Sequence, residues 1–124
     1  MPLITAAAAP VFELPGVRFT GLAAPSRGAR ETAVWLVAIA PGTTPTAHRL
    51  TREETFVAIE GAARATLAGV DYELAAGSAF VVPPDTDFAL ANPHDVPFRA
   101  VVALPVGGQA VVGGDAPVTP PWAE

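Results

Sequence analysis

The chain contains no cysteine and no lysine among its 124 residues. Without cysteine it can form no disulfide bond, and no thiolate is available for catalysis or for binding a metal. The cytoplasm is therefore the compartment that we expect by default. A signal peptide is not expected, because the N-terminal segment MPLITAAAAP has neither a basic region nor a long apolar core.

Basic residues are scarce as well. There are seven, all of them arginine, scattered along a chain whose formal net charge is −5. Proteins that bind nucleic acid need a cluster or stripe of basic side chains, so no nucleic-acid partner is expected. No run approaches the roughly 18 apolar residues that a membrane-spanning helix needs, so no membrane partner is expected either.

Proline and glycine are abundant, with 14 and 11 residues, in a chain that is 51% hydrophobic and 15% charged. Frequent turns between short apolar segments are typical of an all-β fold. The length suits one domain with a real core. We expect a single domain over residues 1–124, with an arm at 1–10 and a tail at 113–124 that Trp122 fixes to the rest.

The expected strands are short, apolar and bounded by turn residues, which is typical of a sandwich or a barrel. Branched and aromatic residues favour strand over helix in the longest apolar run. The expected strands are Val11–Leu14, Val17–Leu22, Thr32–Ala40, Ala47–Leu50, Thr55–Glu60, Ala63–Leu67, Tyr72–Leu74, the segment 78–84, Asp87–Ala91, Pro97–Leu104 and Gln109–Val112.

Two patterns of fixed spacing stand out. In the first, five residues separate Gly42 from His48, Glu54 follows six positions after the histidine, and Gly61 closes the segment. In the second, five residues separate Gly77 from Pro83, and a later asparagine, at position 92, closes the segment. Such glycines are typical of turns in which φ is positive.

Together these patterns resemble the two motifs of the cupin superfamily, G-x5-H-x-H-x3-4-E-x6-G over 42–61 and G-x5-P-x-G-x2-H-x3-N over 77–92. The resemblance implies a double-stranded β-helix, or jelly-roll barrel, of the small single-domain, RmlC-like bacterial type, commonly a homodimer. Two of the three metal-binding histidine positions are replaced, by Leu50 and by Phe88. The inner glycine of the second motif is Asp85.

The replacements weaken the metal site that the resemblance implies. Residues i and i+2 of a strand point to the same face, so an H-x-H pair can hold one ion, and a tight transition-metal site usually has three or more protein ligands. Only His48 and Glu54 remain of the family's set. The other histidine, His94, lies six residues after Phe88, roughly 20 Å along an extended strand. We therefore expect no cofactor, with a weakly bound divalent metal as the alternative.

Three interpretations of His48 and Glu54 remain open. They could form a buried, mutually hydrogen-bonded pair, hold a weak metal, or act as a metal-free acid–base dyad, since histidine changes charge near neutral pH. Arg99 is expected at the surface, and an inward-pointing Arg99 would suit an anionic ligand. Apolar residues beside the pair either pack as core or line a ligand pocket with it, and the pocket candidates are Trp35, His48, Leu50, Glu54, Phe56 and Phe88.

The leading functional prediction is a small-molecule-binding or auxiliary cupin domain with a degenerate metal site and an unassigned ligand. The alternative is a metal-dependent cupin enzyme, of the dioxygenase or isomerase type, that uses His48 and Glu54. A metal-free sugar epimerase ranks lower, because the only tyrosine, Tyr72, is expected near a hairpin tip. A purely structural role would predict a barrel packed solid with side chains.

Overall fold

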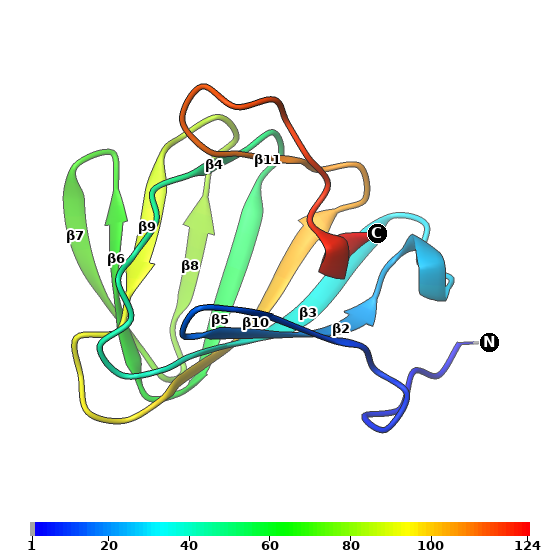
Figure 1. Cartoon of the computed structure of the whole chain (residues 1–124), viewed down its shortest axis with the longest axis horizontal. Coiled ribbons are helices and arrows are strands. Elements are labelled where there is room, and N and C mark those ends of the chain that lie inside the picture. Colours follow the sequence, from blue (N-terminus) through cyan, green and yellow to red (C-terminus); the bar gives the residue numbers. More distant parts are fainter. Residues whose placement is uncertain (1) are drawn as a thin grey trace.

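A computed structural model describes residues 2–124, and they form a barrel of short antiparallel strands (Figure 1). One sheet has six strands in the order β1-β2-β3-β10-β5-β8, a second has the order β7-β6-β9, and β11 pairs with β4. The strands are β1 (Val11–Leu14), β2 (Val17–Ala23), β3 (Thr32–Ile39), β4 (Arg49–Leu50), β5 (Glu54–Glu60), β6 (Ala62–Leu67), β7 (Val70–Ala75), β8 (Ala79–Val82), β9 (Phe88–Ala91), β10 (Phe98–Pro105) and β11 (Ala110–Val111).

The predicted all-β jelly-roll fold is confirmed. Every strand pairing among residues 2–124 is antiparallel, and the only helical elements there are the short 3-10 turns Pro25–Arg27 and Pro121–Ala123. No helix in this part of the chain is long and apolar enough to cross a membrane. In Figure 1 the sheet β7-β6-β9 lies on one side and the six-stranded sheet on the other, with β4 and β11 at the top of the view.

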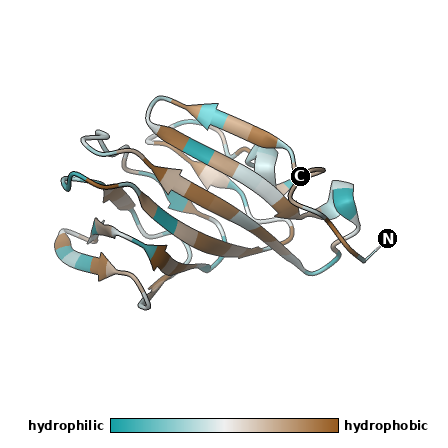
Figure 2. Ribbon diagram, turned by 90° about the horizontal axis from the view of Figure 1, so that it is seen from below, coloured by the Kyte–Doolittle hydropathy of each residue, from teal (hydrophilic) through white to brown (hydrophobic). Residues whose placement is uncertain are grey.

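Alternating residues of the large sheet fill the barrel. Trp35, Val102, Phe56 and Phe80 lie opposite one another in register across β3, β10, β5 and β8, and all four are buried. Burial of each such large side chain contributes roughly 1.5–3 kcal/mol. Figure 2 shows apolar stretches running along these central strands.

The position of β5 corrects one expectation in a way that matters for the site. The strand was expected to begin at Thr55, whereas it begins one residue earlier, at Glu54, which pairs with Val82 of β8. Glu54 therefore has the inward orientation of Phe56, two residues on, and is only 4% exposed.

Two positions of the sequence motifs keep left-handed backbone. Gly61 has a φ of 70°, and a Cβ there would lie 2.3 Å from the carbonyl oxygen of Pro97, so a side chain is excluded. Asp85 has a φ of 55°, and its N–H donates to the carbonyl of Leu50 at 2.7 Å. Aspartate tolerates this region better than most residues, so the replacement of glycine preserves the turn.

The C-terminal tail docks on the barrel, as predicted from Trp122. The indole ring stacks on Phe19 of β2, with ring centroids 3.6 Å apart and planes 2° from parallel. Arg27 reinforces the contact, because its guanidinium donates to the carbonyls of Leu22 at 2.6 Å and of Trp122 at 3.4 Å. The tail thus covers one end of β2 and β3 instead of extending into solvent.

Candidate functional site

His48 lies at the edge of the barrel interior, against the ring of Phe88. The backbones of the two residues exchange hydrogen bonds of 3.0 and 2.8 Å, which places both side chains on the same face. Their ring centroids are 4.4 Å apart, and the Phe88 ring meets Phe56 edge-on at 5.9 Å. His48 is half-buried and Phe88 is 1% exposed, so the three rings lead from solvent into the core.

A backbone carbonyl orients the imidazole. Nδ1 of His48 lies 3.0 Å from the carbonyl oxygen of Thr46, and a carbonyl oxygen only accepts hydrogen bonds. Nδ1 therefore carries the proton, and in the neutral ring Nε2 keeps its lone pair. This contact could not be predicted from the sequence, because a carbonyl is present at every residue.

Glu54 is the only buried side chain of an ionisable type among residues 2–124. The other buried polar side chain there is that of Asn92. Burial raises the pKa of the Glu54 carboxyl from its ordinary 4.5 to about 8. At neutral pH burial thus favours the protonated carboxyl, which carries an O–H that can donate a hydrogen bond.

No protein group in the described part of the chain satisfies that carboxyl. Its side chain takes part in none of the hydrogen bonds there, and no side-chain polar atom of these residues is both fully enclosed and unpaired. The small exposed part of Glu54 therefore includes its carboxyl oxygens. These oxygens are therefore accessible to water.

The hydrogen-bonded pair of His48 and Glu54, one of the three interpretations left open by the sequence, is not formed. The imidazole bonds to Thr46 instead, and burial alone accounts for the raised pKa of the Glu54 carboxyl. The two side chains do lie on the same side of the barrel wall, since Phe88 contacts His48 and also packs on Phe56 beside Glu54.

The residues at the vacated ligand positions do not fit a metal ion. Leu50 is 2% exposed and Phe88 is 1% exposed, and both belong to the main hydrophobic core. Among residues 2–124 no group of three or more His, Asp or Glu side chains is placed to hold a metal. One nitrogen and one carboxylate are fewer donors than transition-metal sites normally use.

The remaining candidates lie outside the barrel. His94 Nε2 is 2.5 Å from the Glu73 carboxylate at the surface, so His94 cannot complete a set of ligands around His48. Arg99 points outward and pairs with Glu60 at 3.2 Å, as expected for a surface residue. Tyr72 lies on β7 and is 47% exposed.

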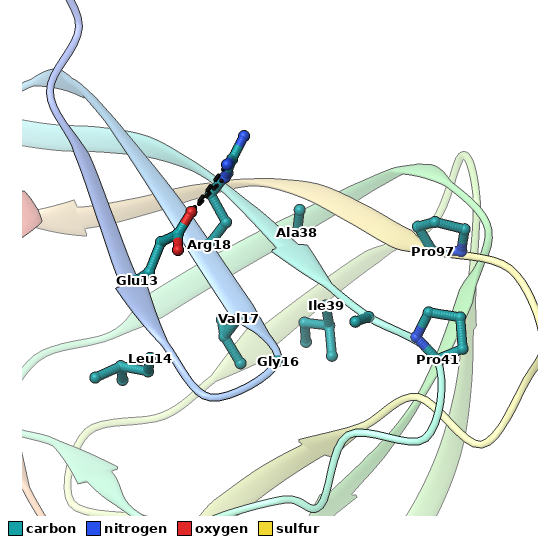
Figure 3. Close-up of a pocket in the computed structure, with 10 residues that line it drawn as sticks. Glu13, Leu14, Gly16, Val17, Arg18, Ala38, Ile39, Pro41 and Pro97 are labelled. Carbon is teal, nitrogen blue, oxygen red and sulfur yellow. Dashed lines mark hydrogen bonds and ion pairs between the residues drawn. The ribbon is translucent and has the colours of Figure 1, made fainter.

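The four apolar pocket candidates, Trp35, Leu50, Phe56 and Phe88, all pack in the hydrophobic core. The hollow drawn in Figure 3 lies elsewhere, beside the β1–β2 turn, and has a volume of about 380 Å³. Its lining includes the exposed ion pair of Glu13 and Arg18 and none of the six pocket candidates. Those six residues remain the prediction for the ligand site.

Asn92 closes the second motif for a structural reason. Its amide donates to the carbonyls of Ile39 at 3.0 Å and Val96 at 2.9 Å, and its oxygen accepts from the N–H of His94 at 3.1 Å. These bonds join the turn after β9 to the end of β3. They satisfy the buried amide on both its donor and its acceptor side.

The barrel, the motif spacing and the placement of His48 and Glu54 define a cupin. The family described as "Cupin domain" matches residues 35–104, which is more than half of the chain, and the chain belongs to this family. The predicted membership of the cupin superfamily is confirmed. No curated protein matches the chain.

Solved structures share the fold at low sequence identity. The polyketide cyclase RemF from Streptomyces resistomycificus is 17% identical, with 85% of this chain and 79% of that chain covered at a TM-score of 0.75. An RmlC-like cupin from Shewanella frigidimarina is also 17% identical, with 85% of this chain and 90% of that chain covered at a TM-score of 0.73. A sugar phosphate isomerase of the cupin superfamily from Silicibacter pomeroyi is 19% identical, with 82% of this chain and 68% of that chain covered at a TM-score of 0.65.

Proposed function

We propose that this cupin binds a small, largely apolar molecule at the inner face of its barrel, without a tightly held transition-metal ion. The observation that carries the proposal is the side chain of Glu54, which is 4% exposed, bonds to no described side chain or backbone group, and keeps its carboxyl oxygens within reach of water. A carboxyl that is largely removed from water loses part of its hydration. A ligand that bonds to this carboxyl would compensate that loss.

The surroundings of the carboxyl favour an apolar ligand. Glu54 shares the inner face of β5 with Phe56, Phe88 packs edge-on against Phe56, and His48 continues this row of rings toward solvent. Apolar walls with a few polar groups are the usual composition of small-molecule sites.

Ligand-observed NMR with a mixed library of small organic fragments tests the proposal. Fragments are expected to bind the wild-type protein and to lose affinity for His48→Ala and for Glu54→Leu. The matched control is Val81→Ala, on the outward face of β8 and 49% exposed, which should bind as the wild type does. Absence of binding fragments, or equal binding to Glu54→Leu, would contradict the proposal.

The second candidate is a metal-dependent cupin enzyme of the dioxygenase or isomerase type. The structural neighbours that are named as a cyclase and an isomerase favour an enzyme, and His48 and Glu54 are the two donors that this chain could offer. Elemental analysis of untagged protein, after incubation with iron, manganese, nickel or zinc and desalting, separates the two. The first proposal expects less than one metal ion per chain, and the second expects one.

We further infer a homodimer in the cytoplasm as the state in which this domain works. The family commonly forms homodimers, and a chain without cysteine suits a reducing compartment. Light scattering of the purified protein measures the oligomeric state. A monomer at micromolar concentration would contradict the dimer.

A further inference from the structure

The solvent side of the six-stranded sheet is apolar over two rows of side chains that run across the strands in register. One row crosses four strands and the next crosses all six. The rows are Val34, Ala103, Thr55 and Val81, then Val11, Thr20, Leu36, Val101, Val57 and Ala79. We call these residues the outer face. Its only polar members are two threonines, and each of its side chains is exposed or half-buried in the single chain.

The smaller sheet shows how a solvated face looks in the same molecule. The outward positions of β6 and β7 place Arg64 opposite Glu73 and Thr66 opposite Asp71, and the Thr66 hydroxyl donates to the Asp71 carboxylate at 2.6 Å. An antiparallel sheet with one face in water normally alternates in this way, apolar inward and polar outward. The outer face of the large sheet departs from this pattern and is suited to contact with another apolar surface.

The two central strands carry the same information in their sequences. β3 reads TAVWLVAI and β10 reads FRAVVALP, with apolar residues at nearly every position. Continuous apolar runs of this kind are typical of strands that are buried on both faces. In the single chain only every second residue of β3 and β10 is buried, so one apolar side of each strand is left for a partner.

We propose that the outer face binds the outer face of a second copy of this chain, with the two large sheets packed against each other around a two-fold axis. This inference rests on the homodimer proposed above and names the surface that forms it. A two-fold interface uses the same patch on both copies, and an apolar patch of valine, alanine and leucine is complementary to itself. Sheets that pack face to face lie about 10 Å apart with interdigitated side chains.

The charges beside the outer face favour a second copy as its occupant. The next row across the strands contains Glu13, Arg18, Ala38, Arg99 and Glu60 in register. Two ion pairs form within this rim, Glu13 with Arg18 at 2.8 Å and Glu60 with Arg99 at 3.2 Å. The rim therefore has no net charge, although the chain as a whole carries −5, and two acidic chains can meet there without repulsion. An anionic membrane surface attracts clusters of free basic side chains, and both arginines of the rim are paired.

The outer face and its rim have the size of a stable interface. Six strands about 4.8 Å apart span roughly 25 Å, and three rows about 7 Å apart span roughly 20 Å with their side chains. The projected area is then roughly 500 Å², and the accessible area of a surface covered with side chains is larger than its projection. Stable dimers bury about 600–1,000 Å² on each partner, so the available surface is sufficient.

Light scattering at micromolar concentration compares the wild type with Val57→Arg, and Val70→Arg is the matched control. Val57 is 42% exposed on the outer face, and Val70 is 52% exposed on β7 of the other sheet. The wild type and Val70→Arg should be dimers. Val57→Arg should weaken association by about a hundredfold or more, because it places an uncompensated charge from each copy in the apolar interface. Circular dichroism checks folding, and Val81→Arg on the edge strand β8 is used if Val57→Arg does not fold.

An introduced thiol reports on the outer face directly, because the natural chain has no cysteine. Val101→Cys lies on the central strand β10 of the outer face. The thiol should react with a maleimide about tenfold more slowly in this chain than in one that also carries Val81→Arg, because the second copy covers it only in the dimer.

The outcomes distinguish this inference from the proposed homodimer. A dimer that persists in Val57→Arg and Val81→Arg, or a thiol at position 101 that reacts equally fast in both chains, overturns the outer face as the interface and leaves the homodimer intact. A monomeric wild type overturns both. Co-sedimentation of that monomer with phosphatidylcholine vesicles would show that a membrane occupies the outer face instead.

Discussion

The Glu54 carboxyl should make the stability of the barrel depend on pH in a way that one substitution removes. Glu54→Gln keeps the size and the hydrogen-bonding capacity of the side chain and abolishes its ionisation. Burial raises the folded-state pKa to about 8, against 4.5 for the exposed group. Between these values the folded protein keeps a proton that the unfolded chain releases. The wild type therefore loses stability as pH rises through this window.

The magnitude follows from the gap between the two pKa values. The full gap corresponds to about 4 to 5 kcal/mol of unfolding free energy above pH 8, and about 3 kcal/mol of it is already lost at pH 7. Domains usually have an unfolding free energy of about 5–15 kcal/mol, so this loss is a large fraction of the total stability. Glu54→Gln should thus equal the wild type at pH 4 and exceed it by about 3 kcal/mol at pH 7.

Chemical denaturation at pH 4, 7 and 9 measures this difference. Glu53→Gln is the matched control, because Glu53 is the neighbouring residue and its side chain is exposed, and it should follow the wild type throughout. A constant difference between Glu54→Gln and the wild type at all three pH values would refute the reasoning. It would mean that the carboxyl is solvated and ionises normally in the folded protein.

Three further predictions concern the metal positions, the tail and the buried asparagine. The double substitution Leu50→His and Phe88→His should give a chain that retains about one zinc or nickel ion after desalting, as measured by elemental analysis. A metal content equal to that of the wild type would show that the barrel no longer has the family's ligand geometry. Trp122→Ala should lower unfolding free energy by about 2–3 kcal/mol through loss of the stack on Phe19, and an unchanged melting temperature would contradict the docking of the tail. Asn92→Ala should cost about 2–4 kcal/mol because it leaves the buried carbonyl of Ile39 and the partly buried carbonyl of Val96 without a donor. Denaturant titration measures the loss, and a smaller loss would mean that water replaces the amide.

The fold was predictable because its signals are local and repeat along the chain. The apolar run Thr32–Ala40 predicted a buried strand, and β3 covers Thr32–Ile39. The spacing from Gly42 to Gly61 identified the family. These signals depend on strand periodicity and on turns that need glycine, and both are readable from sequence.

For the site, the sequence predicted only which residues lie on the same face of the barrel wall. Parity along the strands correctly put His48, Leu50 and Phe88 toward the interior, and it also indicated that Arg99 points outward. Whether His48 bonds to Glu54 or to the Thr46 carbonyl depends on side-chain rotamers and on differences of a few ångströms across the barrel. Neither quantity is encoded in spacing.

The apolar residues at the two ligand positions help to explain the raised pKa of Glu54. A metal ion beside Glu54 would hold the carboxylate in its ionised form, because a bound cation is the strongest local charge in such a site. Leu50 and Phe88 replace donors with apolar, fully buried side chains, so they remove that charge and add desolvation. Both changes move the carboxyl toward its protonated form. The residue at the family motif's anionic ligand position is thereby held mainly in its protonated form, in which it can donate a hydrogen bond.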